Sequence, residues 1–334
     1  LAVVATGESI IREVDGRAAH VPGAVVTRIA SSHLRVGTFQ FAAGTHDPQL
    51  LAALVNHAIA RHAPHAAQAA NPALALFDHV VDVQARLIAR WMEVGFIHGV
   101  MNTDNMTISG ETIDYGPCAF MDTYDPATVF SSIDHGGRYA YGNQPSIATW
   151  NLARLAEVML ALFDDDTDTA VDLATMSLQA FPERFQSAWS AAMRSKLGID
   201  ATDSLGDAVI GDLLLLMQTN AVDYTAGLRS LSAVLRGDAA AAARFGDGFD
   251  EWATRWKPLV VASADELDRR NPIYIARNHL VEAALAAATV GDLAPFEQLL
   301  AAIADPFTLR PGLDRYAEPA PPAFSTTYKT FCGT

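Results

Sequence analysis

The chain has 334 residues, half of them apolar, so it is long enough for two domains and too apolar to be globally disordered. Its 23 Lys and Arg residues against 38 Asp and Glu give a formal net charge of −15, which disfavours a partner such as nucleic acid or an anionic membrane. Two cysteines cannot build a disulfide framework and suit a reducing compartment, and we find no apolar run of about 18 residues that would span a membrane.

The first part of the chain, residues 1 to about 43, has the pattern of extended structure. β-branched residues gather at 1–5 and 24–29, and the pairs Asp15-Gly16 and Pro22-Gly23 are typical of turns. The sequence therefore predicts strands with two turns here.

From residue 46 onward the pattern becomes helical and then irregular. Apolar residues recur at helical spacing over 48–62 and 74–94, and Gly95 is a suitable C-cap for the second helix. Residues 96–117 read as short strands. A long irregular stretch follows at 118–144, and loops of this length inside a domain are usually functional.

After Pro145 helical patterns dominate, and a Pro-rich tail begins at residue 305. The predicted helices are 146–163, 170–196, 206–218, 222–236, 247–256, 263–268, 272–290 and 292–303. The tail should wrap over the surface or be mobile, because its prolines prevent regular structure.

The stretch that carries chemistry is 95–117. A helix is followed by a polar loop, a hairpin turning at Gly110-Glu111 and the triplet D-Y-G, which is the order found in the C-lobe of protein kinases. His98 and Asn105 are seven residues apart, as in the kinase loop H-R-D-x-x-x-x-N, but Val100 stands where the kinase has its catalytic Asp. A valine cannot accept a proton.

Three oxygen-bearing side chains in this stretch suit a magnesium site. Mg²⁺ prefers oxygen ligands, and it typically takes one or two from the protein and the rest from nucleotide phosphates. Asn105 and Asp114 would supply that pair, which leaves Asp104 beside the metal as a base for an incoming hydroxyl. The alternative is that these are ordinary turn residues.

Several longer motifs resemble the selenoprotein O (SelO) family. They are P-G-A-V-V-T-R-I-A-S-S-H-L-R-V-G-T-F-Q at 22–40, H-G-V-M-N-T-D-N-M at 98–106, T-I-D-Y-G-P at 112–117, Y-D-P at 124–126, G-R-Y at 137–139, N-Q-P-x-x-x-x-W-N-L at 143–152 and N-P-x-Y-I-A-R-N-H at 271–279. The resemblance implies a kinase-fold enzyme that binds ATP in an inverted orientation and transfers AMP to protein hydroxyls.

The resemblance also implies a role for each site residue. Asp104 is similar to the family's proton acceptor, and Asn105 and Asp114 to its Mg²⁺ ligands, with Asp114 also part of the nucleotide site. Arg28 and Arg35 resemble its two phosphate-binding arginines. Guanidinium groups suit this task because they bind two phosphate oxygens at once, although a surface or ion-pair role is the alternative for both.

One departure from the family pattern concerns the ATP site. Members carry a Gly-rich loop, a phosphate-contacting Lys and its Glu partner, and none can be placed here: no G-x-G-x-x-G occurs, and Lys196, Lys257 and Lys329 lie in the wrong part of the chain. The chain also begins with Leu1. We therefore expect an N-lobe to be missing and the ATP site of this chain to be severely weakened, so that the chain alone should be inactive or weakly active.

These observations predict an α+β, mainly α, fold: a protein-kinase-like C-lobe with remnant N-lobe strands and a helical C-terminal extension. The expected divisions are an N-lobe remnant with the two arginines (1–43), the C-lobe core with the catalytic and metal loops (44–165), a helical part (166–304) and the tail (305–334). Two alternatives to an adenylyltransferase stay open. One is a conventional protein kinase, against which Val100 argues, and the other is a non-catalytic nucleotide-binding pseudokinase module.

The expected cofactor is Mg²⁺, with Mn²⁺ as an alternative, and the expected partners are ATP and protein substrates with Ser, Thr or Tyr hydroxyls. We expect a monomer in the bacterial cytoplasm that binds neither nucleic acid nor membrane.

The family often keeps a Cys or selenocysteine near its C-terminus, which implies a thiol switch at Cys332 with Cys118 as the partner. His57, His62 and His65 fit a solvated helix face better than a metal site.

Overall fold

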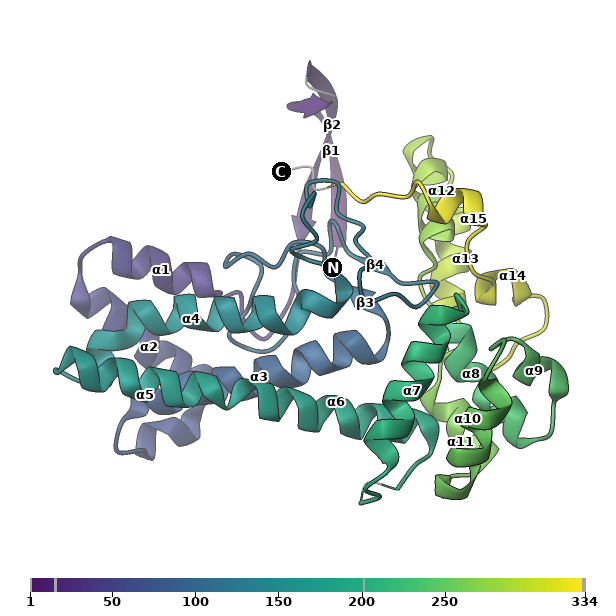
Figure 1. Ribbon diagram of the computed structural model, residues 1–334. Helices are drawn as coiled ribbons and strands as arrows, with labels where there is room; N and C mark the ends of the chain where they lie inside the picture. The colour runs from purple at the N-terminus through teal and green to yellow at the C-terminus, as the bar shows by residue number, and fades with distance from the viewer. Residues whose placement is uncertain (1, 15–16, 201, 332–334) are drawn as a thin grey trace.

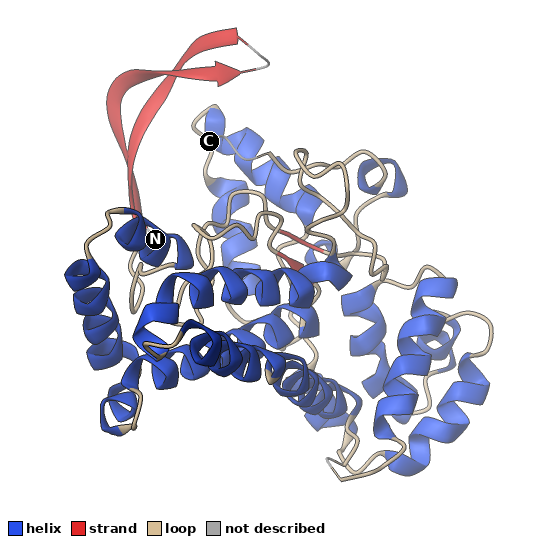
Figure 2. Ribbon diagram, turned by 60° about the vertical axis from the view of Figure 1, so that its left-hand side comes forward, coloured by secondary structure: helices blue, strands red, loops and turns tan. Residues whose placement is uncertain are grey.

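A computed structural model of the chain describes residues 2–14, 17–200 and 202–331. These residues form a mainly helical protein with two small two-stranded sheets (Figures 1 and 2). The prediction of a mainly helical α+β fold is confirmed at this level.

The N-terminal part forms a long antiparallel hairpin. Strand β1 (Ala2–Val14) pairs with β2 (Arg17–Thr27), and Figure 2 shows the hairpin standing away from the helical body. The expected turn at Pro22-Gly23 is wrong, because both residues lie inside β2 where the register shifts between Ala5 and Ser9. Proline is tolerated at such an irregularity, since a donor is not needed there. The expected turn at Asp15-Gly16 lies outside the described residues.

The expectation of extended structure up to residue 43 is also wrong. Helix α1 (Val36–Gly44) occupies the end of that range. Its side chains Val36, Phe39 and Ala42 recur at helical spacing and are buried, and the helix packs against α2 and α4. Burial of this face outweighs the local preference of the sequence for strand.

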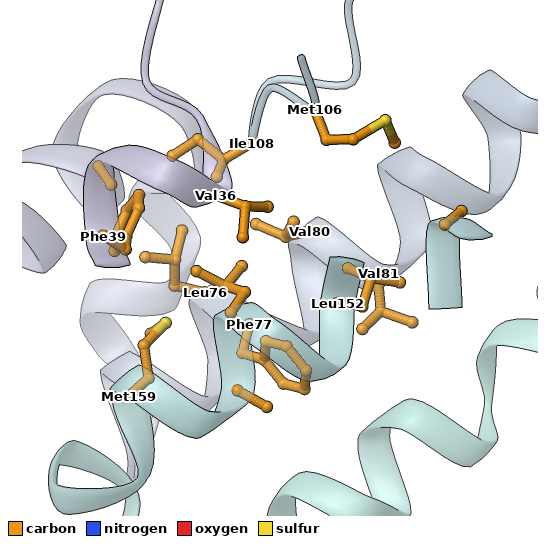
Figure 3. Packing of buried hydrophobic residues seen from close by; sticks show 14 of the residues in the cluster. Val36, Phe39, Leu76, Phe77, Val80, Val81, Met106, Ile108, Leu152 and Met159 are labelled. Carbon is orange, nitrogen blue, oxygen red and sulfur yellow. The ribbon is translucent and has the colours of Figure 1, made fainter. Parts of the chain in front are cut away.

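Helices α2 (Pro48–His62) and α3 (Pro72–Glu93) agree with the predicted ranges. With α1 and α4 (Gln144–Phe163) they enclose the first hydrophobic core, shown in Figure 3. The core also takes in Met106 and Ile108 from the polar loop after α3. The loop that carries the predicted site is therefore anchored in the core by two of its own side chains.

Two later helical predictions need correction. The range 170–196 is divided into α5 (Thr167–Gln179) and α6 (Phe181–Leu197), because Pro182 has no N–H for a continuous helix but suits a first turn. The range 272–290 is helical only from α12 (Asn278–Thr289), since Ile273 and Tyr274 donate their backbone N–H groups to the Pro306 carbonyl in the tail.

The remaining elements agree with the predictions only in part. They are η1 (Pro64–Gln68), β3 (Phe96–Ile97), β4 (Ala119–Phe120), η2 (Tyr141–Asn143), α7 (Gly206–Thr219), α8 (Tyr224–Leu235), α9 (Ala239–Ala243), α10 (Phe249–Trp256), η3 (Lys257–Leu259), α11 (Ala264–Arg270), α13 (Ala294–Ile303), α14 (Asp314–Ala317) and α15 (Pro322–Ser325). Over 96–117 the described strand is β3 alone, and the expected hairpin about Gly110-Glu111 is reduced to an isolated bridge between Met106 and Thr112, because Met106 and Ile108 are buried in the first core. Strand β4 lies in the stretch predicted as irregular, and α9, α14 and α15 are short helices that the sequence did not predict, the last two in the tail. A second core lies among α6, α7, α8 and α10, and a third, smaller one lies beneath α12 and α13.

One stretch, Tyr141–Phe163, is long and apolar enough by composition to cross a membrane, contrary to the expectation from the sequence. Its helix α4 lies between α1, α3 and α5, and buried side chains such as Leu152 and Leu155 belong to the first core. Its apolar character is therefore explained by packing inside the protein.

The buried Lys196 of α6 should make stability depend on pH. The residue is 2% exposed, and among the described residues its ammonium group makes two long hydrogen bonds, both at 3.5 Å, to the Arg270 carbonyl and Asn271 Oδ1. Burial lowers its pKa from 10.5 to about 8, while the charge of Glu93 partly opposes the shift. Between these two pH values the unfolded chain binds a proton that the folded chain lacks, so the free energy of unfolding should rise with pH there.

Urea titrations of the wild type and of Lys196→Met between pH 7 and 10.5 test this prediction. The substitution should stabilise the protein by about 3 kcal/mol near pH 7, and this difference should shrink as the pH rises through 8 and above. A difference that does not change with pH would contradict it.

Candidate active site

The polar loop after α3 is fastened to the N-terminus of α1. The segment 34–37 runs beside residues 103–108, and an isolated bridge pairs Arg35 with Thr107. The bridge consists of two backbone hydrogen bonds, Val36 N to Met106 O (3.0 Å) and Ile108 N to Leu34 O (3.0 Å), and a third joins Gly37 N to Thr103 O (2.8 Å). Two stretches some seventy residues apart in the sequence thus form one unit.

Arg35 and Asp104 are brought together by this unit. Arg35 Nη1 donates a hydrogen bond to the backbone carbonyl of Asp104 (3.1 Å), and the Asp104 side chain is exposed. The backbone N–H of Asp104 is held by Asn102 Oδ1 at 3.0 Å. Arg28 is exposed just beyond the end of β2, and among the described residues no hydrogen bond ties its guanidinium to the loop. The structure therefore groups one of the two predicted arginines with Asp104.

Asn105 is buried, with 8% of its surface exposed, and a hydrogen bond sets the orientation of its amide. Its Nδ2 donates to the Val100 carbonyl at 2.9 Å, which leaves Oδ1 as the atom that can bind a cation. Val100 itself is buried, so the residue at the position of the kinase aspartate contributes packing and a carbonyl. This orientation is compatible with the predicted role of Asn105 as an oxygen ligand.

Asp114 is half-buried and has a positive φ of 58°, a left-handed conformation that non-glycine residues rarely adopt. Such backbone conformations are found preferentially at functional sites, where the surrounding structure enforces them. The Ile113 carbonyl just before it accepts a hydrogen bond from His98 Nε2 at 2.8 Å. Contacts from the polar loop therefore fix the start of the D-Y-G turn.

His98 joins the loop of Asn105 to the turn of Asp114. It is fully buried, its Nε2 donates to Ile113, and its Nδ1 accepts from the Val100 N–H at 3.4 Å. Burial lowers its pKa, although the Ile113 carbonyl and the charge of Asp114 oppose the shift. The ring is therefore neutral at physiological pH and acts as a fixed connection between the two predicted metal ligands.

Two supporting residues escaped the sequence analysis. Gln144 accepts the His98 N–H (3.1 Å) and donates to the Phe96 carbonyl (3.0 Å), and Asn151 donates to the Met101 carbonyl (2.9 Å). Both are buried and lie in α4. Their only signal in the sequence was the motif N-Q-P-x-x-x-x-W-N-L, which contains both but does not reveal their contacts.

The oxygen atoms of Asn105 and Asp114 suit a Mg²⁺ ion that is also bound by nucleotide phosphates better than a metal ion bound by protein side chains alone. Over the ranges 2–14, 17–200 and 202–331, no three or more His, Cys, Asp or Glu side chains gather as a metal would require. An amide oxygen from Asn105 and a carboxylate from Asp114 are both hard ligands, and a nucleotide would complete the coordination.

A cavity of about 780 Å³ opens directly after Asp114. Tyr115, Gly116 and Cys118 form one side of it and the tail residue Phe331 another. The tail reaches this point because Thr330 Oγ1 donates to the Pro117 carbonyl at 2.7 Å.

Burial and the charge of Asp114 raise the pKa of Cys118 to about 11, so its thiol is protonated at neutral pH. Cys332 lies outside the described residues, and its pairing with Cys118 stays a prediction.

The sequence matches the family model described as "Protein adenylyltransferase SelO" over residues 1–304. It is 58% identical to the "Protein nucleotidyltransferase YdiU" of Mycolicibacterium paratuberculosis, in an alignment that covers 100% of this chain and 68% of that protein. Proteins of the same name from Mycolicibacterium smegmatis and Cereibacter sphaeroides are 57% and 53% identical, each over 100% of this chain and 68% and 69% of their own length.

Proposed function

Because the chain belongs to the SelO family of protein adenylyltransferases, we propose that it transfers AMP from ATP to Ser, Thr or Tyr hydroxyls of other proteins. The observation that carries the proposal is the similarity of the whole chain to protein nucleotidyltransferases, with the family's motifs present at 98–106 and 112–117. The enzyme is a nucleotidyltransferase, and ATP is its substrate.

The proposed reaction is a substitution at the α-phosphorus of ATP. The oxygen of a protein hydroxyl forms a bond to this phosphorus, the bond to the oxygen that bridges to the β-phosphate breaks, and pyrophosphate leaves. Asp104 takes the hydroxyl proton, which its exposed position permits. Arg35, next to Asp104, and Arg28 offset the charge of the phosphates.

Asn105 and Asp114 would hold Mg²⁺, with Mn²⁺ as the alternative ion. When bound, the ion neutralises charge on the phosphate oxygens. The free Oδ1 of Asn105 and the enforced backbone of Asp114 support this assignment. His98 keeps the two elements in register, so it is a positioning residue for both.

We further propose a kinase-like C-lobe as the framework, because the order of helix, polar loop, tight turn and D-Y-G is that of a kinase. In this scheme 1–43 contributes the arginines, 44–165 the catalytic and metal loops, 166–304 a helical extension and 305–334 the tail. We propose a monomer in the bacterial cytoplasm without nucleic-acid or membrane partners; the relatives named above are bacterial, and the net charge is −15.

ATP labelled separately on the α- and γ-phosphates distinguishes the proposal from its alternatives. The full-length natural protein is incubated with Mg²⁺ and bacterial acceptor proteins, and we expect the α label alone to be retained on protein. Retention of the γ label alone would indicate a conventional kinase. Nucleotide binding without incorporation of either label would indicate a pseudokinase module.

A further inference from the structure

We infer that Gly37 is a positioning residue for Asp104, because only a glycine leaves the space in which the Asp104 carboxylate lies. The inference rests on the proposed role of Asp104 as proton acceptor. It assigns a function to a residue of α1 that bears no chemical group of its own.

The geometry leaves little choice of residue at this position. A Cβ built on Gly37 would lie closer than 3.0 Å to Asp104 Oδ1, nearer than real Cβ atoms come to another heavy atom, and 3.1 Å from its Cγ. The backbone around it offers no comparable obstacle, since the Thr103 carbonyl would be 3.4 Å away, an ordinary contact. A methyl group at residue 37 would therefore collide with the carboxylate of Asp104 in particular.

The carboxylate would have to move, because the backbone beneath it is held. Gly37 N donates to Thr103 O, Val36 N donates to Met106 O, and Arg35 Nη1 donates to Asp104 O. The Asp104 side chain is exposed and can rotate toward solvent. An alanine at 37 should thus leave the loop in place and turn the proposed base away from the incoming hydroxyl.

Gly44 provides a matched control in the same helix. It is the last residue of α1, and a Cβ there would meet nothing within 4 Å. Neither glycine has a positive φ, so alanine suits the backbone at both positions. The two substitutions add the same methyl group, and only one of them places it against Asp104.

The test compares the steady-state AMP transfer of Gly37→Ala and Gly44→Ala in the full-length natural protein. We expect Gly37→Ala to lower kcat by about 100-fold, as misplacement of a catalytic group by about 1 Å does, and to leave the KM for ATP nearly unchanged. Gly44→Ala should behave as the wild type. In an Asp104→Ala background, Gly37→Ala should cause no further loss, because the group on which it acts is absent.

The outcomes separate this inference from the proposed function. If Asp104→Ala transfers AMP at the wild-type rate, Asp104 is not the base and the proposed mechanism fails first. If Asp104→Ala is impaired but Gly37→Ala is not, or if Gly37→Ala lowers the rate equally with and without Asp104, the inference alone is overturned. Should Gly37→Ala fail to fold, the Asp104→Ala double variant decides: recovery of folding supports the collision, and continued failure refutes it.

Discussion

Asp104→Ala should lower the rate of AMP transfer by about 10²–10⁴-fold and leave nucleotide binding largely intact. A positioned base acts mainly in the transition state, where it accepts the proton of the attacking hydroxyl, so its loss should appear in kcat. Asp114→Ala should instead abolish metal-dependent ATP binding, because it removes a charged ligand of the proposed ion. The two carboxylates are thus expected to have separable roles.

Calorimetric titration with ATP and Mg²⁺, together with initial rates from α-labelled ATP, measures both effects. Asp165→Ala is the control, since it removes an equal charge from an exposed position in the acidic break after α4. Equal losses of ATP affinity in Asp104→Ala and Asp114→Ala would contradict the division of roles. An unaffected rate in Asp104→Ala would remove Asp104 from the mechanism.

Arg277→Ala should reduce the free energy of unfolding by about 3–5 kcal/mol, the usual effect of removing one partner from a buried ion pair. The Arg277 side chain is fully buried, and its Nη1 donates to Asp122 Oδ1 (2.6 Å) and Asp223 Oδ2 (2.7 Å). Its Nη2 donates to Asp223 Oδ1 (3.0 Å) and to the Ala317 carbonyl (3.1 Å). Without the guanidinium, two nearly buried carboxylates would lose their cationic partner.

The effect should reach the segment beside the site. Asp122 lies two residues after β4, Asp223 is the N-cap of α8, and Arg277 precedes α12, so the cluster joins three parts of the chain. Burial opposes the charged form, yet the two carboxylates raise the pKa of Arg277, which keeps it cationic at every accessible pH. The residue belongs to the motif N-P-x-Y-I-A-R-N-H, for which the sequence offered no structural role.

Urea unfolding of Arg277→Ala and of Arg255→Ala provides the comparison. Arg255 pairs with Asp212 at 2.6 Å, but both side chains are about half exposed. Its removal should therefore change stability by no more than about 1 kcal/mol. Equal effects of the two substitutions would show that burial does not set the strength of the Arg277 cluster.

The local pattern of apolar residues predicts secondary structure correctly where interactions within one segment determine its conformation. The range 48–62 is a helix, as its apolar spacing predicts, and in the structure Asp47 caps it ahead of Pro48. It failed at Val36–Gly44, where β-branched residues upstream suggested strand while packing against α4 selected helix. It failed again at Pro22-Gly23, since a strand pair can absorb a proline at a register shift.

The sequence by itself determined the family, the helical character and the identities of Asp104, Asn105 and Asp114 as candidates, because these depend on residue type and short spacing. Only the tertiary structure decided that Asn105 presents Oδ1, that His98 is a neutral buried connection, and that Gly37 abuts Asp104. Each of these depends on a hydrogen bond or steric contact that arises only when distant segments, such as 34–37 and 103–108, pack together. Patterns of residue type within a few positions contain no information about such contacts, because long-range packing and burial create them.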